Sequence, residues 1–129
     1  MKIAILSDIH GNYIALKAVL EEAKRQKVNH LFLLGDQLGY FYRAIEVFEL
    51  IKEWSYDIIS GNHERLFLEY LKAAEARKNE INNKYGYCFS YYEEHFSKTL
   101  ISEIKQLPEQ KIVKKDNLSF LLCHGSPNN

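Results

Sequence analysis

Four short apolar segments of this chain each end directly at a polar cluster. The segments span residues 2–6, 31–34, 57–60 and 118–123, and each has the length and composition of a strand. The clusters that follow are Asp8-Ile9-His10, Gly35-Asp36, Gly61-Asn62-His63 and His124-Gly125. Because the carboxyl ends of the strands in an open α/β sheet lie along one edge, where ligands bind, this pattern predicts a single site at that edge.

The segments between the first three apolar runs have the periodicity of helices. Asn12 is a suitable N-cap for the first helix, and the spacing predicts that its buried stripe consists of Leu16, Val19, Leu20 and Ala23. A second helix is expected over about 43–54, with Ile45, Phe48, Leu50 and Ile51 available for burial. Alternating strands and helices predict parallel strands joined by right-handed crossovers.

Residues 64–107 contain no convincing strand and only one glycine, so we expect two or three helices there. Six aromatic residues gather between Tyr85 and Phe96, and packing into a helical core is favoured over stacking on a substrate. After Pro108, two strands are predicted over 110–115 and 118–123. Asp116-Asn117 between them is a suitable pair for a tight turn.

The composition is that of a single soluble domain covering residues 1–129. Seventeen basic residues balance seventeen acidic ones, so the chain lacks the positive footprint that duplex nucleic acid or an anionic membrane would attract. No apolar stretch is long enough for a signal peptide or a membrane span, which favours a cytoplasmic protein. Two cysteines do not make a disulfide framework, and Cys123 is expected to be a buried, reduced thiol.

The polar clusters offer the donor types of a divalent metal site. Any one of them could be a helix cap or a buried histidine, but four at the ends of strands are hard to explain in that way. Carboxylate, imidazole and amide oxygen together suit Mn²⁺, Fe²⁺, Zn²⁺, Co²⁺ or Ni²⁺. Asp36 could bridge two such ions about 3.5–4 Å apart. The candidate ligands are Asp8, His10, Asp36, Asn62 and His124.

Charge and chemistry together suggest a hydrolytic role. Two divalent ions would exceed the charge of Asp8 and Asp36, so the site would attract a phosphate despite the neutral chain. Such ions lower the pKa of a shared water toward ~7 and so provide a bridging hydroxide. His63 could protonate the leaving oxygen or stabilise the developing charge. Glu64 could orient His63, or it could be an exposed acidic residue at the start of a helix.

These residues resemble the motifs of the calcineurin-like metallophosphoesterases, and of their small bacterial and archaeal phosphodiesterase-type members in particular. The resemblance is carried by Asp8-x-His10, Gly35-Asp36-x-x-Gly39, Gly61-Asn62-His63-Glu64 and His124-Gly125-Ser126-Pro127. It implies an αββα sandwich and hydrolysis of phosphomonoesters or phosphodiesters by a metal-bridging hydroxide. It also implies that Asp8, His10 and Asp36 hold one ion, that Asp36, Asn62 and His124 hold the other, and that His63 is the catalytic residue.

One motif of that family is missing, so the sandwich is expected to be incomplete at its C-terminal side. The family places a Gly-His-x-His stretch on a later strand, and nothing after His124 supplies it. His30, before a strand, and His95, in a predicted helix, are unsuitable substitutes. Water or a partner chain would replace the missing ligands, and an open sheet edge would invite self-association.

Two alternatives to an active enzyme therefore stay open: an impaired half-domain, and a module that binds a phosphorylated partner in the same cleft. The expected substrate is a small phosphoester, and nucleic acid is disfavoured by the charge balance. Tyr40, Phe41 and Tyr42 either contact a leaving group or pack against the next helix.

Overall fold

A parallel three-stranded sheet forms the centre of the computed structural model, which describes residues 1–127. Its strands are β1 (Ile3–Leu6), β2 (His30–Leu33) and β3 (Tyr56–Ile58), in the order β1-β2-β3. Every pairing is parallel, with Ile3 opposite His30 and Leu31 opposite Tyr56. The parallel arrangement expected from the alternation of strands and helices is thus confirmed.

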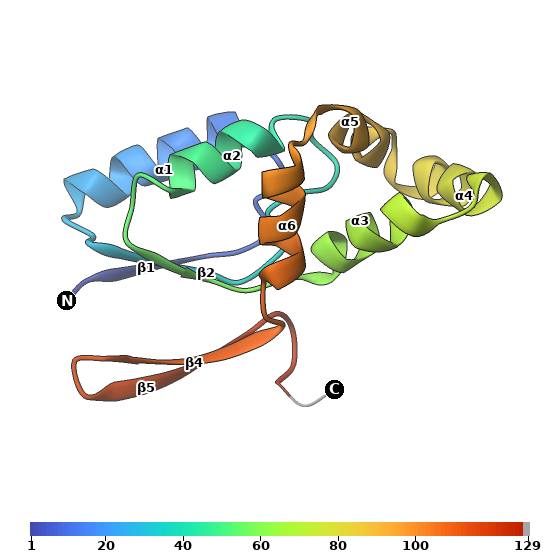
Figure 1. Ribbon diagram of the computed structural model, residues 1–129. Coiled ribbons are helices and arrows are strands. Elements are labelled where there is room, and N and C mark those ends of the chain that lie inside the picture. Colours follow the sequence, from blue (N-terminus) through green and yellow to red (C-terminus); the bar gives the residue numbers. More distant parts are fainter. Residues whose placement is uncertain (128–129) are drawn as a thin grey trace.

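Helices α1 (Tyr13–Arg25) and α2 (Ala44–Ile51) make the crossovers and cover one face of this sheet (Figure 1). The side chain of Asn12 accepts the N–H of Ala15, so the predicted N-cap is confirmed. Leu16, Leu20 and Ala23 are buried against the sheet and α2 as expected. Val19 was predicted to be buried with them, but it is 43% exposed because α2 covers only part of the stripe and the flank beside β1 is open.

Four helices, rather than two or three, follow β3. They are α3 (Asn62–Lys72), α4 (Glu75–Tyr85), α5 (Cys88–His95) and α6 (Lys98–Gln106). Gly86, with φ of +81°, ends α4 in a left-handed conformation. The chain also leaves the helical conformation at Ala73 and Phe96, which are extended. Ser97, directly after Phe96, is the N-cap of α6 and accepts the N–H of Leu100, so the end of α5 has a local signal. Ala73 does not break helices by itself, so the end of α3 comes from tertiary packing.

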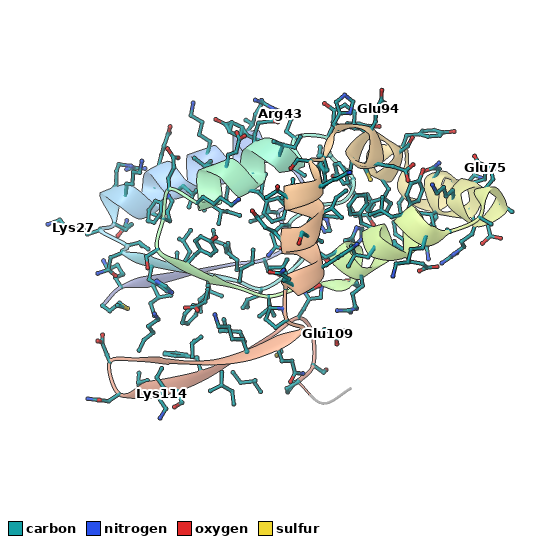
Figure 2. The ribbon with its side chains drawn as sticks, viewed as in Figure 1. Lys27, Arg43, Glu75, Glu94, Glu109 and Lys114 are labelled. Atoms are coloured by element: carbon teal, nitrogen blue, oxygen red, sulfur yellow. The ribbon has the colours of Figure 1, made fainter. Side chains whose placement is uncertain are left out.

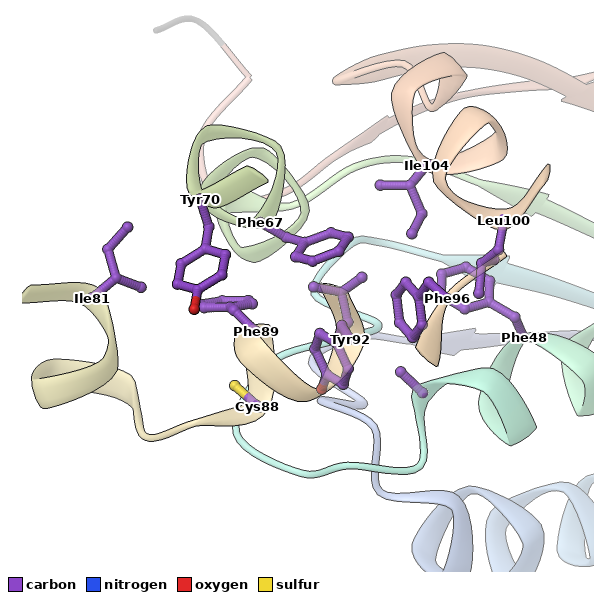
Figure 3. Packing of buried hydrophobic residues seen from close by; sticks show 12 residues of the cluster. Phe48, Phe67, Tyr70, Ile81, Cys88, Phe89, Tyr92, Phe96, Leu100 and Ile104 are labelled. Carbon is purple, nitrogen blue, oxygen red and sulfur yellow. The ribbon is translucent and has the colours of Figure 1, made fainter. Parts of the chain in front are cut away.

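The aromatic residues of this helical region form its core (Figure 3). Phe89 and Tyr92 are fully buried, Phe96 is nearly so, and all three rings pack around Phe67 of α3. Tyr87 is 63% exposed and lies outside this core. The expectation of a helical core therefore holds for most of the cluster, and the α3–α6 region is a packed wall beside the sheet.

Strands β4 (Gln110–Lys115) and β5 (Leu118–Cys123) pair in an antiparallel hairpin on the other face of the central sheet (Figure 1). Asp116 and Asn117 have φ angles of +50° and +67°, the left-handed pair of a tight hairpin turn. Val113 and Leu122 are buried against Phe32 and Ile59 of the central sheet. The hairpin and this face of the central sheet therefore form a second hydrophobic layer between them.

The structure is an α/β fold with the layers of an incomplete αββα sandwich. Within residues 1–127 no helix covers the outer face of the hairpin, where the cross-strand pair Ile112 and Leu121 is 71% and 50% exposed. The surface carries charges of both signs, such as Lys27, Glu75 and Lys114 (Figure 2).

Cys123 is half-buried, not buried as expected, because it ends β5 at the margin of the hairpin. No helix in the described part of the chain is long and apolar enough to cross a membrane.

Candidate metal centre

The loops after β1 and β2 extend the sheet pairing beyond the strands. The N–H of Asp8 donates to the carbonyl of Gly35 at 3.0 Å, and the N–H of His10 donates to the carbonyl of Asp36 at 2.9 Å. Asp8, His10 and Asp36 all have positive φ, between +51° and +57°. Each such residue costs about 1–3 kcal/mol, and such strain persists only where the surrounding structure enforces it, often at functional sites.

The predicted ligands converge at the carboxyl ends of the strands. Nε2 of His10 lies 3.4 Å from Oδ1 of Asp8 and 3.8 Å from Oδ2 of Asp36. Nε2 of His124, which follows β5, lies 3.4 Å from the same Asp36 oxygen. Asp36 is buried at the centre of this group and is shared by two sets of donors. Within each set the ligand atoms all lie within 4.8 Å of one another; the sets are Asp8, Asp36 and His124, and His10, Asp36 and His63.

These sets divide the residues differently from the family pattern. The resemblance implies Asp8, His10 and Asp36 on one ion, whereas the tightest groups place Asp8 with His124 and His10 with His63. His10 nevertheless contacts both carboxylates. The geometry therefore brings all the predicted charged and imidazole ligands to one place and is compatible with either division between two ions.

Both candidate imidazole ligands are oriented by backbone carbonyls. Nδ1 of His10 donates to the carbonyl of Leu38 at 3.0 Å, and Nδ1 of His124 donates to that of Leu34 at 2.7 Å. When Nδ1 carries the proton of a neutral imidazole, the Nε2 lone pair faces the carboxylates. This arrangement, with Nδ1–H held by a carbonyl, is typical of histidines that bind metals.

Asn62 completes the donor set as the first residue of α3. Its Oδ1 lies 3.0 Å from Nε2 of His124. When the imidazole carries its proton on Nδ1, its Nε2 lone pair and this oxygen lie close enough for both to bind one cation. The donors therefore fit divalent cations in chemistry and in placement, as carboxylate, imidazole and amide oxygen suit such ions.

His63 is buried directly behind the predicted ligands. Its backbone N–H donates to Oδ1 of Asp36 at 2.8 Å, which ties the start of α3 to the shared carboxylate. Its ring packs against His10 and Tyr40, with centroid distances of 4.6 and 4.9 Å. Nδ1 of His63 is buried without a hydrogen-bond partner. Burial lowers the pKa of His63, although the nearby charge of Asp36 opposes the shift.

Gly39 makes room for this imidazole. A Cβ at Gly39 would lie 2.1 Å from Nδ1 of His63, and the φ of Gly39 is +102°. Gly61 has a similar role on the other side, because a Cβ there would lie 2.2 Å from Oδ1 of Asp36. No side chain fits at either position without displacing a site residue.

Glu64 neither orients His63 nor lies exposed, so both expectations for it are wrong. Its carboxylate is fully buried and accepts the N–H groups of Asp36 at 2.7 Å, Gly61 at 2.8 Å and Leu38 at 3.3 Å. Burial raises the pKa of Glu64 to about 7, against the effect of these donors. Glu64 thus binds together the loops that carry the site.

The other two histidines lie elsewhere, as expected. Nδ1 and Nε2 of His30 contact Ser55 and Asp57 at the opposite ends of the strands, and His95 stacks on Tyr91. Asp8 is partly exposed at the margin of the site. Its pKa is lowered because hydrogen bonding from Ser7 and the nearby histidines outweigh the effect of burial.

The sequence analysis did not predict the supporting contacts of three residues, which are Tyr92, Glu64 and Gly39. Tyr92 of α5 accepts the N–H of Gly39 at 2.9 Å and donates to the carbonyl of Phe41, so it fixes the loop after Asp36. Glu64 and Gly39 belong to the motifs, but their contacts join segments far apart in the chain. The glycines in Gly35-Asp36-x-x-Gly39 and Gly61-Asn62 were the available signals, because a glycine beside a site residue often marks close packing.

The comparison with known proteins agrees with this fold. The sequence matches the family model described as calcineurin-like phosphoesterase over residues 1–128. The chain therefore belongs to the calcineurin-like phosphoesterase family.

Its relatives include proteins from archaea and bacteria. An uncharacterized protein of Methanocaldococcus jannaschii is 33% identical over 92% of this chain and 40% of its own length. Serine/threonine-protein phosphatase 2 of Escherichia coli is 22% identical over 94% of this chain and 56% of its own. The chain thus spans about half the length of the curated relatives it matches.

Two solved structures share the fold. A metallophosphoesterase from Sphaerobacter thermophilus is 29% identical, with a TM-score of 0.68 over 88% of this chain and 44% of that one. A hypothetical protein from Pyrococcus horikoshii has a TM-score of 0.74 at 22% identity, over 92% of this chain and 52% of that one. The second likeness supports the fold alone.

Proposed function

We propose that this protein hydrolyses phosphoester bonds with two divalent metal ions held around Asp36. The observation that carries the proposal is that the buried carboxylate of Asp36 belongs to two sets of donors. Within each set, the ligand atoms lie within 4.8 Å of one another. Membership of the phosphoesterase family supports the class of reaction. Phosphomonoesters and phosphodiesters are both compatible with such a site.

The proposed division of ligands follows the family resemblance, with which the donor geometry is compatible. Asp8, His10 and Asp36 would hold one ion, and Asp36, Asn62 and His124 the other. When bound, the ions would supply positive charge for the phosphate and a hydroxide nucleophile at neutral pH. These donors suit several divalent ions, namely Mn²⁺, Fe²⁺, Zn²⁺, Ni²⁺ and Co²⁺.

His63 is the proposed catalytic residue. It lies 4.6 Å from the ring of His10 and beside the shared carboxylate. Because burial favours its neutral form, the better supported of its two expected roles is to donate an N–H to the oxygen on which charge develops. A role of this kind contributes roughly 10²–10⁴ in rate.

An impaired half-domain, or a module that binds a phosphorylated partner, is the second candidate. The donor sets around Asp36 are compatible with it as well, since binding of metal and phosphate does not require turnover. In that case the ligands described above would bind metal and phosphate without turnover.

The experiment compares hydrolysis of bis(p-nitrophenyl) phosphate by wild type, Asp36→Asn and His63→Ala with added Mn²⁺ or Ni²⁺. His95→Ala is the matched control, since this imidazole is exposed and outside the site. We expect His63→Ala to lose at least about 100-fold in kcat, and the control to keep its activity. Calorimetric Mn²⁺ titration should show weaker binding by Asp36→Asn, at least roughly tenfold. Equal background rates in all four proteins, with Mn²⁺ binding intact, would favour the non-catalytic candidate.

A further inference from the structure

Tyr40 is a half-exposed aromatic residue held in a strained backbone conformation beside the site. Its side chain is 50% exposed and its φ is +65°. A bulky residue with positive φ is unfavourable by about 1–3 kcal/mol, and such residues gather at ligand-binding sites. The aromatic contacts of Tyr40 are with His10, His63 and Tyr85, none of which belongs to α2, the helix that follows.

The ring of Tyr40 lies against the imidazoles of the candidate metal centre. Its centroid is 5.0 Å from that of His10 and 4.9 Å from that of His63. On another side it lies 6.1 Å from the ring of Tyr85, which itself contacts His63 at 5.3 Å. A group bound next to these two histidines would therefore be within reach of an aromatic surface.

The backbone around Tyr40 is fixed on both sides. Its own N–H donates to Sγ of Cys88 at 3.2 Å. The hydroxyl of Tyr92 accepts the N–H of Gly39 and donates to the carbonyl of Phe41. Because the peptide is held before and after Tyr40, its ring is positioned in advance, and little conformational entropy would be lost when a ligand stacks on it.

We propose that Tyr40 determines substrate specificity by stacking on a planar aromatic group attached to the phosphate, so that the preferred substrates are aryl or nucleobase-bearing phosphoesters. This inference rests on the proposed function, since the site next to the ring must hold the phosphate. Every aromatic or heteroaromatic ring has a π-face that can stack on a tyrosine, whereas an alkyl group offers only apolar contact. The hydroxyl of Tyr40 is not required.

The test measures binding of phenylphosphonate and methylphosphonate to the Mn²⁺-loaded protein by calorimetry. These probes share the phosphonate group and differ in the aromatic ring. The variants are Tyr40→Gly, which removes the ring and suits the left-handed backbone, and Tyr40→Phe, which keeps the ring. Tyr87→Ala is the control, because Tyr87 is an exposed tyrosine in the short link between α4 and α5 and lies outside the aromatic core.

We expect Tyr40→Gly to weaken phenylphosphonate binding by about 5- to 100-fold and to leave methylphosphonate binding within about twofold. Tyr40→Phe and Tyr87→Ala should bind both probes like wild type. The inference is overturned if Tyr40→Gly weakens both probes equally or neither, or if wild type does not prefer phenylphosphonate. Binding does not depend on turnover, so a protein that keeps this preference but cleaves nothing refutes the proposed hydrolysis alone.

Discussion

The buried carboxylate of Glu64 accepts the backbone N–H of Asp36 at a distance of 2.7 Å. The same oxygen accepts the N–H of Gly61 at 2.8 Å, so one atom joins the loop after β2 to the start of α3. Both loops carry candidate metal ligands. The position of Asp36 relative to Asn62 and His63 is therefore set in part by a residue that is not among the predicted ligands.

Glu64→Gln tests this role. The amide retains one acceptor oxygen, but its NH₂ group would face a backbone N–H that now has no acceptor. We expect the free energy of unfolding to fall by about 1–3 kcal/mol, measured by urea denaturation. Glu94→Gln is the matched control, since Glu94 is exposed on α5 (Figure 2). Equal midpoints for wild type and Glu64→Gln would contradict the role.

Gly39→Ala should displace His63. The added Cβ would lie 2.1 Å from Nδ1 of the imidazole, in a backbone conformation that alanine rarely adopts. Gly86→Ala is an unusually close control, because Gly86 also has positive φ, at +81°, but its Cβ would meet open space.

We expect both variants to lose about 1–3 kcal/mol of stability from backbone strain. Only Gly39→Ala should also shift the ring signals of His63 in NMR spectra and reduce phosphodiester hydrolysis, by roughly 100-fold or more. Unchanged His63 signals in Gly39→Ala would show that the loop can move away without disturbing the site.

Asp57 predicts how stability depends on pH. It accepts hydrogen bonds from Lys111 at 2.7 Å, which joins the hairpin to the central sheet, and from His30 of the neighbouring strand β2 at 2.7 Å. Burial alone would raise its pKa, but the hydrogen bonds and the charges of Lys111 and Lys115 outweigh burial and lower it. The folded protein therefore favours the carboxylate more than the unfolded chain does.

This stabilising contribution is complete above the ordinary aspartate pKa of about 3.9 and is lost as the pH falls through the lower folded pKa. We expect the melting temperature of wild type to fall below about pH 4. Asp57→Asn should be less stable at pH 7 and should lose less stability between pH 5 and pH 3. Parallel pH profiles in thermal melts would rule out this contribution.

The free edge of β1 predicts weak self-association. Within residues 1–127, β1 pairs only with β2, and Ile5 on it is 62% exposed. A groove of about 340 Å³ beside it is lined by Ile5, Leu16 and Val19 among others. Unpaired apolar edges of sheets tend to pair with other chains.

Sedimentation velocity over a concentration series should show self-association of wild type. Ile5→Lys should reduce this association, and Ile14→Lys, a change on helix α1, should not reduce it. A monomer at every concentration would refute this expectation.

Local pattern was sufficient for much of the fold. The apolar runs at residues 2–6 and 31–34 correspond to β1 and β2 within one residue, and the Asp116-Asn117 pair forms the predicted turn. Periodicity and turn chemistry are properties of neighbouring residues, so they can be read without knowing the fold. The convergence of Asp8 and Asp36 was also predictable, because neighbouring parallel strands place their carboxyl ends along one edge. His124 reaches the same place from the antiparallel hairpin, and only the packing of that hairpin on the central sheet decided this.

The sequence by itself determined the strands, the turn and the set of donor residues that meet at the sheet edge. Only the tertiary structure decided that Glu64 is a buried link between loops, that Gly39 makes room for His63, and that Tyr40 stays exposed beside it. It also ended helix α3 at Ala73, where no local signal exists. The physical reason is that burial, steric contact and hydrogen bonds between distant segments depend on which surfaces meet, and local propensity does not specify that.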